Sequence, residues 1–218
     1  MEWPPLSPRS IDFANSTVGY GRSIPSNNEA LVKTNNGGTT WSIETASPPR
    51  LFTAMAFSRT LGIAAYDTYT GTQALTELYR SSTGGRSWQS LSTMLGITVS
   101  AVKSLGGQEW ALQAQPTLGS YTRVEISHDN GKHWSKTGLR VPAGTLTSMV
   151  SNKAIWVFSN PPKTSASRTG RLRLESFGGT MHNAVLSFPV IGSKHYLVNG
   201  LDFLNAWVGW VSATEYVE

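Results

Sequence analysis

The stretch Ser127–Trp134 (SHDNGKHW) predicts a tight turn between two β-strands. The carboxylate of Asp129 is expected to accept hydrogen bonds from the backbone N–H groups one and two residues further on, as short Asx side chains commonly do. Gly131 supplies a backbone angle that a residue with a Cβ resists. Trp134 then begins the returning strand and places a large apolar ring toward a core.

The same pattern recurs along the chain. Residues 34–41 (TNNGGTTW) and 81–88 (SSTGGRSW) repeat the hydroxyl, the glycine and the tryptophan, with Asn or Thr at the Asx position. The three tryptophans are 47 and 46 residues apart, and a further step of 48 reaches His182 in a degraded copy. Because an active site needs no copies, we expect structural roles in these turns for Thr34, Asn36, Gly38, Trp41, Ser81, Thr83, Gly85, Trp88, Ser127, Asp129, Gly131 and Trp134.

The pattern Ser/Thr-x-Asp-x-Gly-x-x-Trp resembles the Asp-box, or bacterial neuraminidase repeat, of sialidase-like β-propellers. A second motif, 11–20 (IDFANSTVGY), reappears as 201–210 (LDFLNAWVGW), about four repeat lengths later. The order of the two motifs resembles the photosystem II assembly/stability factor family and its bacterial relatives. That resemblance implies an extracytoplasmic, non-enzymatic scaffold that holds another protein. In photosynthetic members the partner is a reaction-centre subunit precursor, bound partly through arginines.

A period near 47 residues with several short strands per repeat is typical of propeller blades. Only 14% of the residues are charged, and stretches of helix-forming residues are missing. We predict an all-β propeller of four-stranded antiparallel blades in one domain, 1–218, with blades at about 10–45, 52–92, 97–138 and 145–190 and a half blade at 199–218. This favours an incomplete ring, with a closed five-blade ring as the alternative. The exposed edge of the half blade predicts self-association.

Composition narrows the function classes. The chain has no cysteine, and its four histidines form no metal-binding pattern, so we expect neither a metal nor another cofactor. No apolar run approaches the length of a transmembrane helix, and the first residues do not form a signal peptide. The pI of about 9.6 comes without clustered basic runs, and we therefore expect no nucleic-acid partner.

Antiparallel geometry assigns the loops of each predicted blade to two ends. We call the end that carries the repeated turns the box end and the opposite one the far end. The far end is predicted to carry the long loops, at 22–29, 67–73, 115–121 and 160–170. Long loops on a rigid scaffold commonly carry function.

Basic residues outnumber acidic ones at the predicted far end by the whole net charge of +5. Such a surface suits an anionic partner, for example carboxylates on a peptide or a glycan. The alternative is that these cations only keep a Gly-, Ser- and Thr-rich chain in solution. The predicted partner-binding residues are Arg22, Arg50, Tyr66, Arg140, Lys163, Arg168, Arg171 and Lys194.

A secreted glycoside hydrolase, sialidase-like or xyloglucanase-like, is the alternative function. Asp12 and Asp202 occupy equivalent positions and could face each other as acid and base. As repeated residues, they are more simply interpreted as acceptors for neighbouring backbone N–H groups, and we therefore predict no catalytic residue. A sialidase site would also need the residue types that Arg140, Tyr66, Glu77 and Asp67 supply, but their spacing does not connect them. Arg22-Ser23-Ile24-Pro25 resembles the Arg-Ile-Pro element of sialidases only loosely, because a serine interrupts it.

Overall fold

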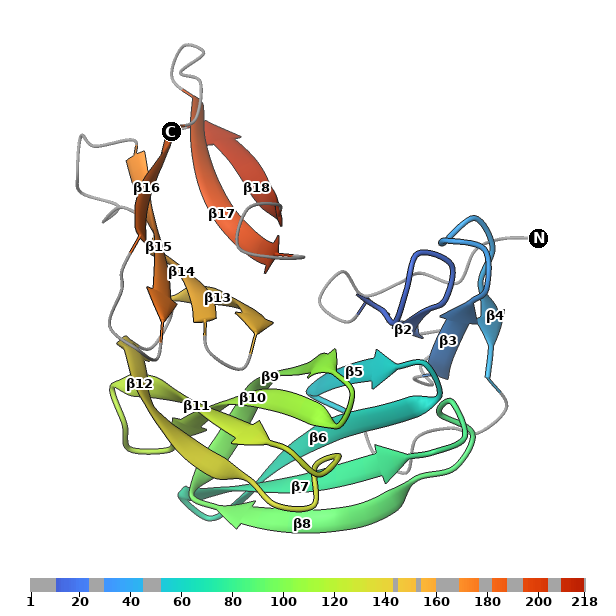
Figure 1. The fold of residues 1–218 in the computed structure, drawn as a ribbon. Helices are drawn as coiled ribbons and strands as arrows, with labels where there is room; N and C mark the ends of the chain where they lie inside the picture. The colour runs from blue at the N-terminus through green and yellow to red at the C-terminus, as the bar shows by residue number, and fades with distance from the viewer. Residues whose placement is uncertain are drawn as a thin grey trace. The chain divides into compact units, whose positions relative to one another are not determined.

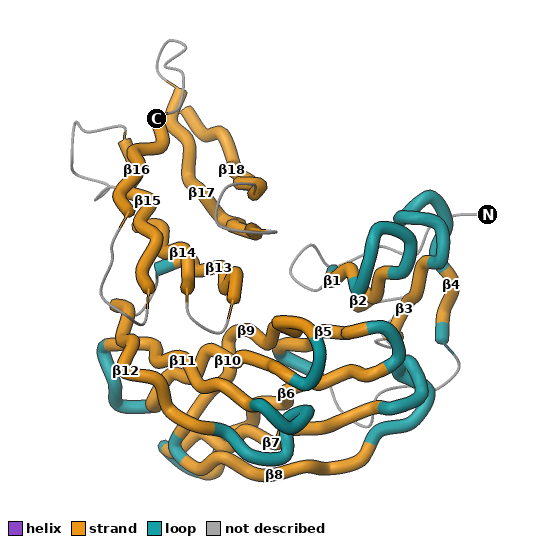
Figure 2. The backbone as a smooth tube through the Cα atoms, viewed as in Figure 1, coloured by secondary structure: helices purple, strands orange, loops and turns teal. Residues whose placement is uncertain are grey.

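The computed structural model describes residues 11–23, 30–44, 52–142, 145–151, 154–159, 169–176, 182–187, 194–203 and 209–217. The regular structure in this part of the chain is all β-strand (Figures 1 and 2). The chain divides into two compact units, Met1–Lys136 and Thr137–Glu218, which we describe separately.

The first unit contains antiparallel sheets whose strands follow one another in chain order (Figure 1). The first sheet comprises β1 (Asp12–Phe13), β2 (Gly19–Ser23), β3 (Ala30–Thr34) and β4 (Ser42–Ile43). The second comprises β5 (Ala54–Ser58), β6 (Leu61–Thr70), β7 (Gln73–Ser81) and β8 (Gln89–Leu95). The third comprises β9 (Ile97–Gly106), β10 (Glu109–Pro116), β11 (Tyr121–Ser127) and β12 (Ser135–Pro142), the last of which continues into the second unit.

The second unit contains a fourth sheet and a two-stranded sheet. The fourth sheet comprises β13 (Leu146–Ser151), β14 (Ala154–Ser159), β15 (Thr169–Ser176) and β16 (His182–Ser187). The two-stranded sheet pairs β17 (Lys194–Phe203) with β18 (Gly209–Val217). These meanders confirm the predicted class, all-β with four-stranded antiparallel sheets. The predicted blade boundaries and the incomplete ring remain predictions.

One predicted loop is wrong. Residues 67–73 were expected to form a long loop, whereas β6 runs to Thr70 and β7 begins at Gln73. Thr68, Tyr69 and Thr70 are residue types that favour strands, and Gly71, at a φ of +63°, allows the chain to reverse within two residues. The described far-end connections of the second and third sheets are therefore short.

Aromatic packing joins the first sheet to the second. The rings of Tyr20 and Phe57 stack with centroids 3.7 Å apart, and Phe52 packs edge-on against Trp88. Between the second and third sheets the core is built from smaller side chains around the buried Trp110. This second cluster contains Ala56, Ile63, Ala65, Leu78, Ile97, Val99, Val102, Trp110, Leu112 and Ala114.

A phenylalanine opposite a glycine explains the second sequence motif. Phe13 pairs with Gly19 across β1 and β2, and the same register joins Phe203 to Gly209 across β17 and β18. A Cβ added to Gly19 would lie 2.8 Å from the ring of Phe13. Glycine therefore leaves the space that the phenylalanine ring covers.

The glycines of the repeated turns make close contacts between sheets. Gly85 has a φ of +89°, and a Cβ there would lie 2.2 Å from Cδ2 of Leu31 in the first sheet. Gly131 has a φ of +83°, and its Cβ would lie 2.5 Å from Cδ1 of Ile63 in the second sheet. In both turns the backbone therefore lies against an apolar side chain of the preceding sheet. Glycine is required for two reasons, the positive φ and the lack of space for a Cβ.

We predict that Gly85→Ala lowers the free energy of unfolding by about 2–4 kcal/mol, because left-handed strain adds to overpacking against Leu31. Gly71→Ala is the matched control, since Gly71 also has a positive φ but its Cβ would meet nothing within 4 Å. Urea unfolding of both variants measures the difference. Equal losses would mean that the contact with Leu31 contributes nothing.

Candidate functional site

The repeated turns share one network of hydrogen bonds centred on the first hydroxyl. Ser127 Oγ accepts from the backbone N of Asp129 at 3.3 Å and of Gly131 at 2.8 Å. Thr34 and Ser81 accept equivalent bonds in the other two turns. Our expectation for Asp129 is wrong in detail, because its carboxylate accepts from the backbone N of His133, four residues further on, at 2.9 Å. The serine hydroxyl takes the nearer N–H groups, which leaves the carboxylate to close the turn.

At the Asx position, Asn36 and Thr83 accept the same backbone hydrogen bond as Asp129. The backbone N of Thr40 donates to Asn36 Oδ1 and that of Ser87 to Thr83 Oγ1, each at 2.9 Å. In the first two turns the tryptophan Nε1 also donates to the glycine carbonyl, at 3.1 Å and 3.0 Å. These bonds connect the repeated residues within each turn.

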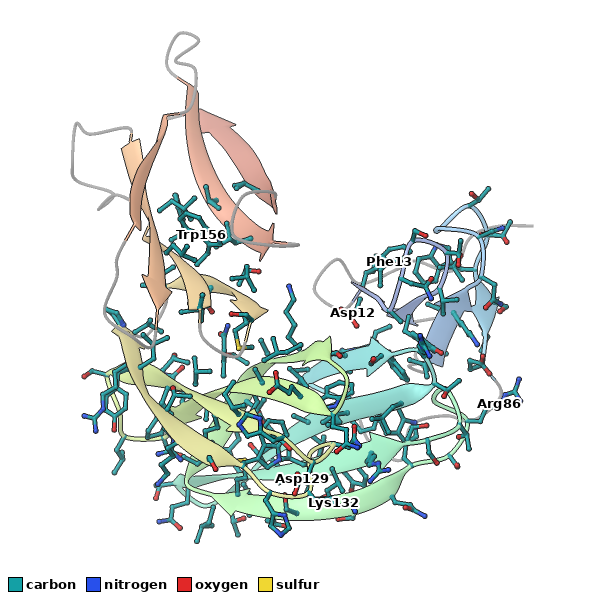
Figure 3. All side chains as sticks on the ribbon, viewed as in Figure 1. Asp12, Phe13, Arg86, Asp129, Lys132 and Trp156 are labelled. Carbon is teal, nitrogen blue, oxygen red and sulfur yellow. The ribbon has the colours of Figure 1, made fainter. Side chains whose placement is uncertain are left out.

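Among the described residues of the box end, Asp129 is a carboxylate whose pKa is strongly shifted. The backbone N–H of His133, then its imidazole and the hydroxyl of Ser127, hold the Asp129 pKa well below its usual range. His133 Nδ1 lies 2.5 Å from Asp129 Oδ2, and His128 Nδ1 lies 3.0 Å from Glu109 Oε1. Both pairs are exposed, and Figure 3 shows Asp129 beside Lys132 on the turn between β11 and β12. No group of three or more possible metal-ligating side chains occurs within the described ranges.

Asp12 joins the first sheet to the second (Figure 3). Its Oδ2 accepts a hydrogen bond from the backbone N of Phe57 at 2.8 Å. This contact agrees with the interpretation of Asp12 as an acceptor for neighbouring backbone. Asp202 occupies the equivalent register position, opposite Trp210, and its side chain lies outside what the structure describes.

Asp67 makes a comparable bond between the second and third sheets. Its two carboxylate oxygens each lie 3.2 Å from the backbone N of Val99. Thr76 Oγ1 donates to Asp67 Oδ1 at 2.5 Å. Burial raises the Asp67 pKa, and the bonds from Thr76 and Val99 oppose that rise. Asp67 was predicted to lie on a loop, and it lies instead in β6.

Arg22 belongs to a strand rather than to the predicted loop, and Tyr66 lies within a strand. Arg22 lies in β2, is half-buried, and its guanidinium donates to the backbone O of Phe52. Tyr66 lies in β6, where it packs against the aromatic cluster between the first two sheets. Reversal of Arg22 is therefore expected to lower the melting temperature, because the side chain joins two segments of the fold.

Of the four residues named above for a sialidase site, Tyr66 and Glu77 lie next to each other. Tyr66 and Glu77 are cross-strand partners on β6 and β7, and Tyr79 OH donates to Glu77 Oε2 at 2.5 Å. Arg86, on the second repeated turn, lies 3.5 Å from Glu44. Glu44, which directly follows β4, also lies 3.9 Å from Lys33.

Most of the predicted basic surface lies beyond the described side chains. Arg50, Lys163 and Arg168 lie outside the described residues, and Arg171 and Lys194 are described only as backbone in β15 and β17. Arg140 is exposed in β12. The basic surface therefore stays a prediction.

The far ends of the second and third sheets carry a cluster that the sequence did not predict. Tyr69, Leu95 and Leu118 are 65%, 67% and 99% exposed, and we call these three residues the far-end patch. They come from the end of β6, the end of β8 and the loop between β10 and β11. A signal was present in the sequence, because 68–76, 87–102 and 110–122 contain no Asp, Glu, Lys or Arg.

Backbone hydrogen bonds hold the turns around the patch together. Gly96 N donates to Ala74 O at 2.8 Å, and Thr117 N donates to Gly96 O at 2.9 Å. Ala74 N donates in turn to Thr117 Oγ1 at 3.3 Å. Three turns that are distant in sequence therefore lie next to one another.

Neither a family model nor a curated protein sequence matches the chain, but solved structures do. TolB from Acinetobacter baumannii is 10% identical, with a TM-score of 0.58 over 96% of this chain and 51% of TolB. Hadza microbial sialidase Hz136 is 14% identical, with a TM-score of 0.55 over 90% of this chain and 48% of that one.

The chain has the β-propeller fold. YCF48 bound to D1 peptide is also similar, at 15% identity and a TM-score of 0.49 over 93% of this chain and 62% of YCF48. This propeller chain spans between about half and three fifths of the length of these three structures. The part that the structure describes contains no helix long and apolar enough to cross a membrane.

We predict that Asp12→Ala lowers the free energy of unfolding by about 1–3 kcal/mol, because the half-buried N–H of Phe57 loses its acceptor. Asp12→Asn retains an acceptor oxygen and should cost less. Urea unfolding measures both. An Asp12→Ala protein as stable as the parent would remove the structural role of this carboxylate.

A second prediction concerns pH. Because the Asp129 pKa is lowered by folding, its contribution to stability is complete above the unfolded-state pKa of about 3.9 and is lost as the pH falls below it. Asp129→Asn should keep the turn, as Asn36 does, without this titration. The melting temperature of the parent should therefore fall more between pH 5 and pH 2 than that of the variant. Parallel curves would contradict the assignment.

Proposed function

We propose that this propeller is a binding scaffold that holds an uncharged segment of a partner protein against the far-end patch. The observation that carries the proposal is the joint exposure of Tyr69, Leu95 and Leu118 on hydrogen-bonded turns. Large apolar side chains that gather on a rigid surface are typical of protein-binding sites. Tyrosine suits such a site because it offers a wide apolar ring with a polar tip.

The charge distribution favours an uncharged partner segment. The far-end turns 70–73, 95–97 and 117–120 consist of neutral hydroxyl, amide and apolar residues and glycine; the half-buried Asp67 lies two residues before Tyr69, and the exposed Arg140 lies near the end of β12. An anionic group held against these turns would lose hydration without gaining a counterion from them. A basic surface formed by Arg50, Lys163, Arg168, Arg171 and Lys194 remains a separate proposal for anionic parts of a partner.

The engagement of the carboxylates supports a scaffold over a glycoside hydrolase. A general acid or nucleophile has to reach the substrate, whereas Asp12 and Asp67 accept backbone hydrogen bonds that connect neighbouring sheets. Hydrolysis of fluorogenic glycosides by the protein is the direct test of the alternative. The proposal also includes an extracytoplasmic location, suggested by the resemblance of the turns and testable by fractionation of the native host.

The triple variant Tyr69→Ser, Leu95→Ser, Leu118→Ser tests the patch. Selection of a phage-displayed peptide library on the parent protein should enrich uncharged sequences with apolar residues. Their affinity should fall at least tenfold for the variant, with little dependence on salt. The melting temperature should change little, because the three side chains are largely exposed.

The matched control is Thr60→Ala, Gln108→Ala, Lys132→Ala, three exposed box-end residues. This control should retain peptide binding. Equal loss in both triple variants, or enrichment of acidic peptides released by salt, would overturn the choice of surface. Binding of neutral oligosaccharides on a glycan array, without peptide binding, would instead identify the patch as a sugar site.

A further inference from the structure

Strand β8 is the end strand of the second sheet, and it lacks the usual protection of an exposed edge. Its seven residues, Gln89–Leu95 (QSLSTML), include no charged residue and no proline. Gln89, Ser90, Thr93 and Leu95 are exposed. Natural proteins commonly place lysine, proline or charged residues on such edges, because unpaired N–H and C=O groups recruit other strands.

The equivalent strand of the third sheet carries protective residues that β8 lacks. Counted from the two repeated turns, β12 (SKTGLRVP) is the counterpart of β8 and also ends its sheet. It carries Lys136, Arg140 and Pro142, the residue types that protect an edge. One repeat thus has a protected outer strand and the adjacent repeat does not.

The register of β8 determines which backbone groups are available. Thr93 pairs with Glu77 and Leu95 with Leu75 across β7 and β8. Gly96 N donates to Ala74 O, so the alternation of an antiparallel ladder directs the N–H and C=O groups of Thr93 and Leu95 away from β7. A bulge between Leu78 and Tyr79 distorts the first half of β8, which leaves the regular segment Ser92–Leu95 for pairing.

We propose that β8 pairs antiparallel with β8 of a second copy of this chain, and so joins two propeller chains about a two-fold axis. Thr93 of one copy then exchanges N–H···O=C bonds with Leu95 of the other, and Met94 lies opposite its own counterpart. The segment is compatible with itself, because no charge meets a like charge and the exposed Leu95 gains apolar cover. An isologous two-fold contact of this kind closes after two copies.

Sedimentation velocity of the protein over a range of concentrations tests the proposal. The parent should show a reversible monomer–dimer equilibrium. Thr93→Lys should raise the dimer dissociation constant at least tenfold, because two cations meet across the axis. Thr93→Pro should do the same by removing an outward N–H, while the bonds to β7 remain. Leu95 belongs to both the far-end patch and this contact, so peptide binding is measured on the monomeric Thr93→Lys variant, whose patch residues are unchanged. Loss of the dimer with retained peptide binding then separates this proposal from the proposed function.

Charge complementation distinguishes pairing from a general loss of structure. Thr93→Lys and Thr93→Glu should each be monomeric alone and should form a heterodimer when mixed. Gln108→Lys adds the same charge at an exposed turn and should leave the dimer unchanged. A monomeric parent overturns the proposal. So does a dimer that survives both Thr93 substitutions and is lost in Asn183→Lys, since β16 is another end strand without charged residues.

Discussion

The described first unit depends on carboxylates that accept backbone N–H groups of the following sheet. Four-stranded sheets packed face to face bury the edges of their first strands together with apolar side chains, and a buried N–H without a partner costs about 1–3 kcal/mol. Asp12 supplies the acceptor for Phe57, and Asp67 supplies it for Val99. The raised pKa of Asp67 shows the cost of this arrangement, because burial destabilises the charge that makes the bond. Hydrogen bonds from Thr76 and Val99 offset part of that cost.

The repeated turns at the box end combine close packing with satisfied backbone N–H groups. A turn that presses against the preceding sheet cannot carry a Cβ where Gly85 and Gly131 meet Leu31 and Ile63. The hydroxyl at the first position then satisfies the N–H groups that the turn leaves unpaired. In the first turn Gly38 has only ordinary contacts, and its φ of +89° alone favours glycine there. The hydroxyl is present in all three turns, whereas the Asx position accepts Asn, Thr or Asp.

The sequence allowed prediction of what depends on short-range chemistry. The turns and the all-β class follow from residues a few positions apart. The role of Asp67 could not be predicted, because its partner Val99 lies 32 residues away and the choice depends on how two sheets pack. The loop predicted at 67–73 was misplaced for a local reason, since Thr68, Tyr69 and Thr70 continue β6. Arg22 was assigned to a loop, and its charge to the surface, because the end of β2 was placed too early.

The net charge of +5 is not spread evenly over the described far ends. The far-end turns 70–73, 95–97 and 117–120 contain no basic residue, whereas the exposed Arg140 lies near the end of β12. The same absence of charge extends along β8, where it removes the repulsion that keeps edge strands apart. Uncharged stretches of 9 to 16 residues in a chain that is 14% charged are therefore informative in themselves. They meet at the far-end turns of the second and third sheets, where the residues directly before and after Tyr69, Leu95 and Leu118 are uncharged. A surface of this composition is stabilised by contact with another apolar surface, and that physical argument connects the proposed scaffold to the proposed dimer.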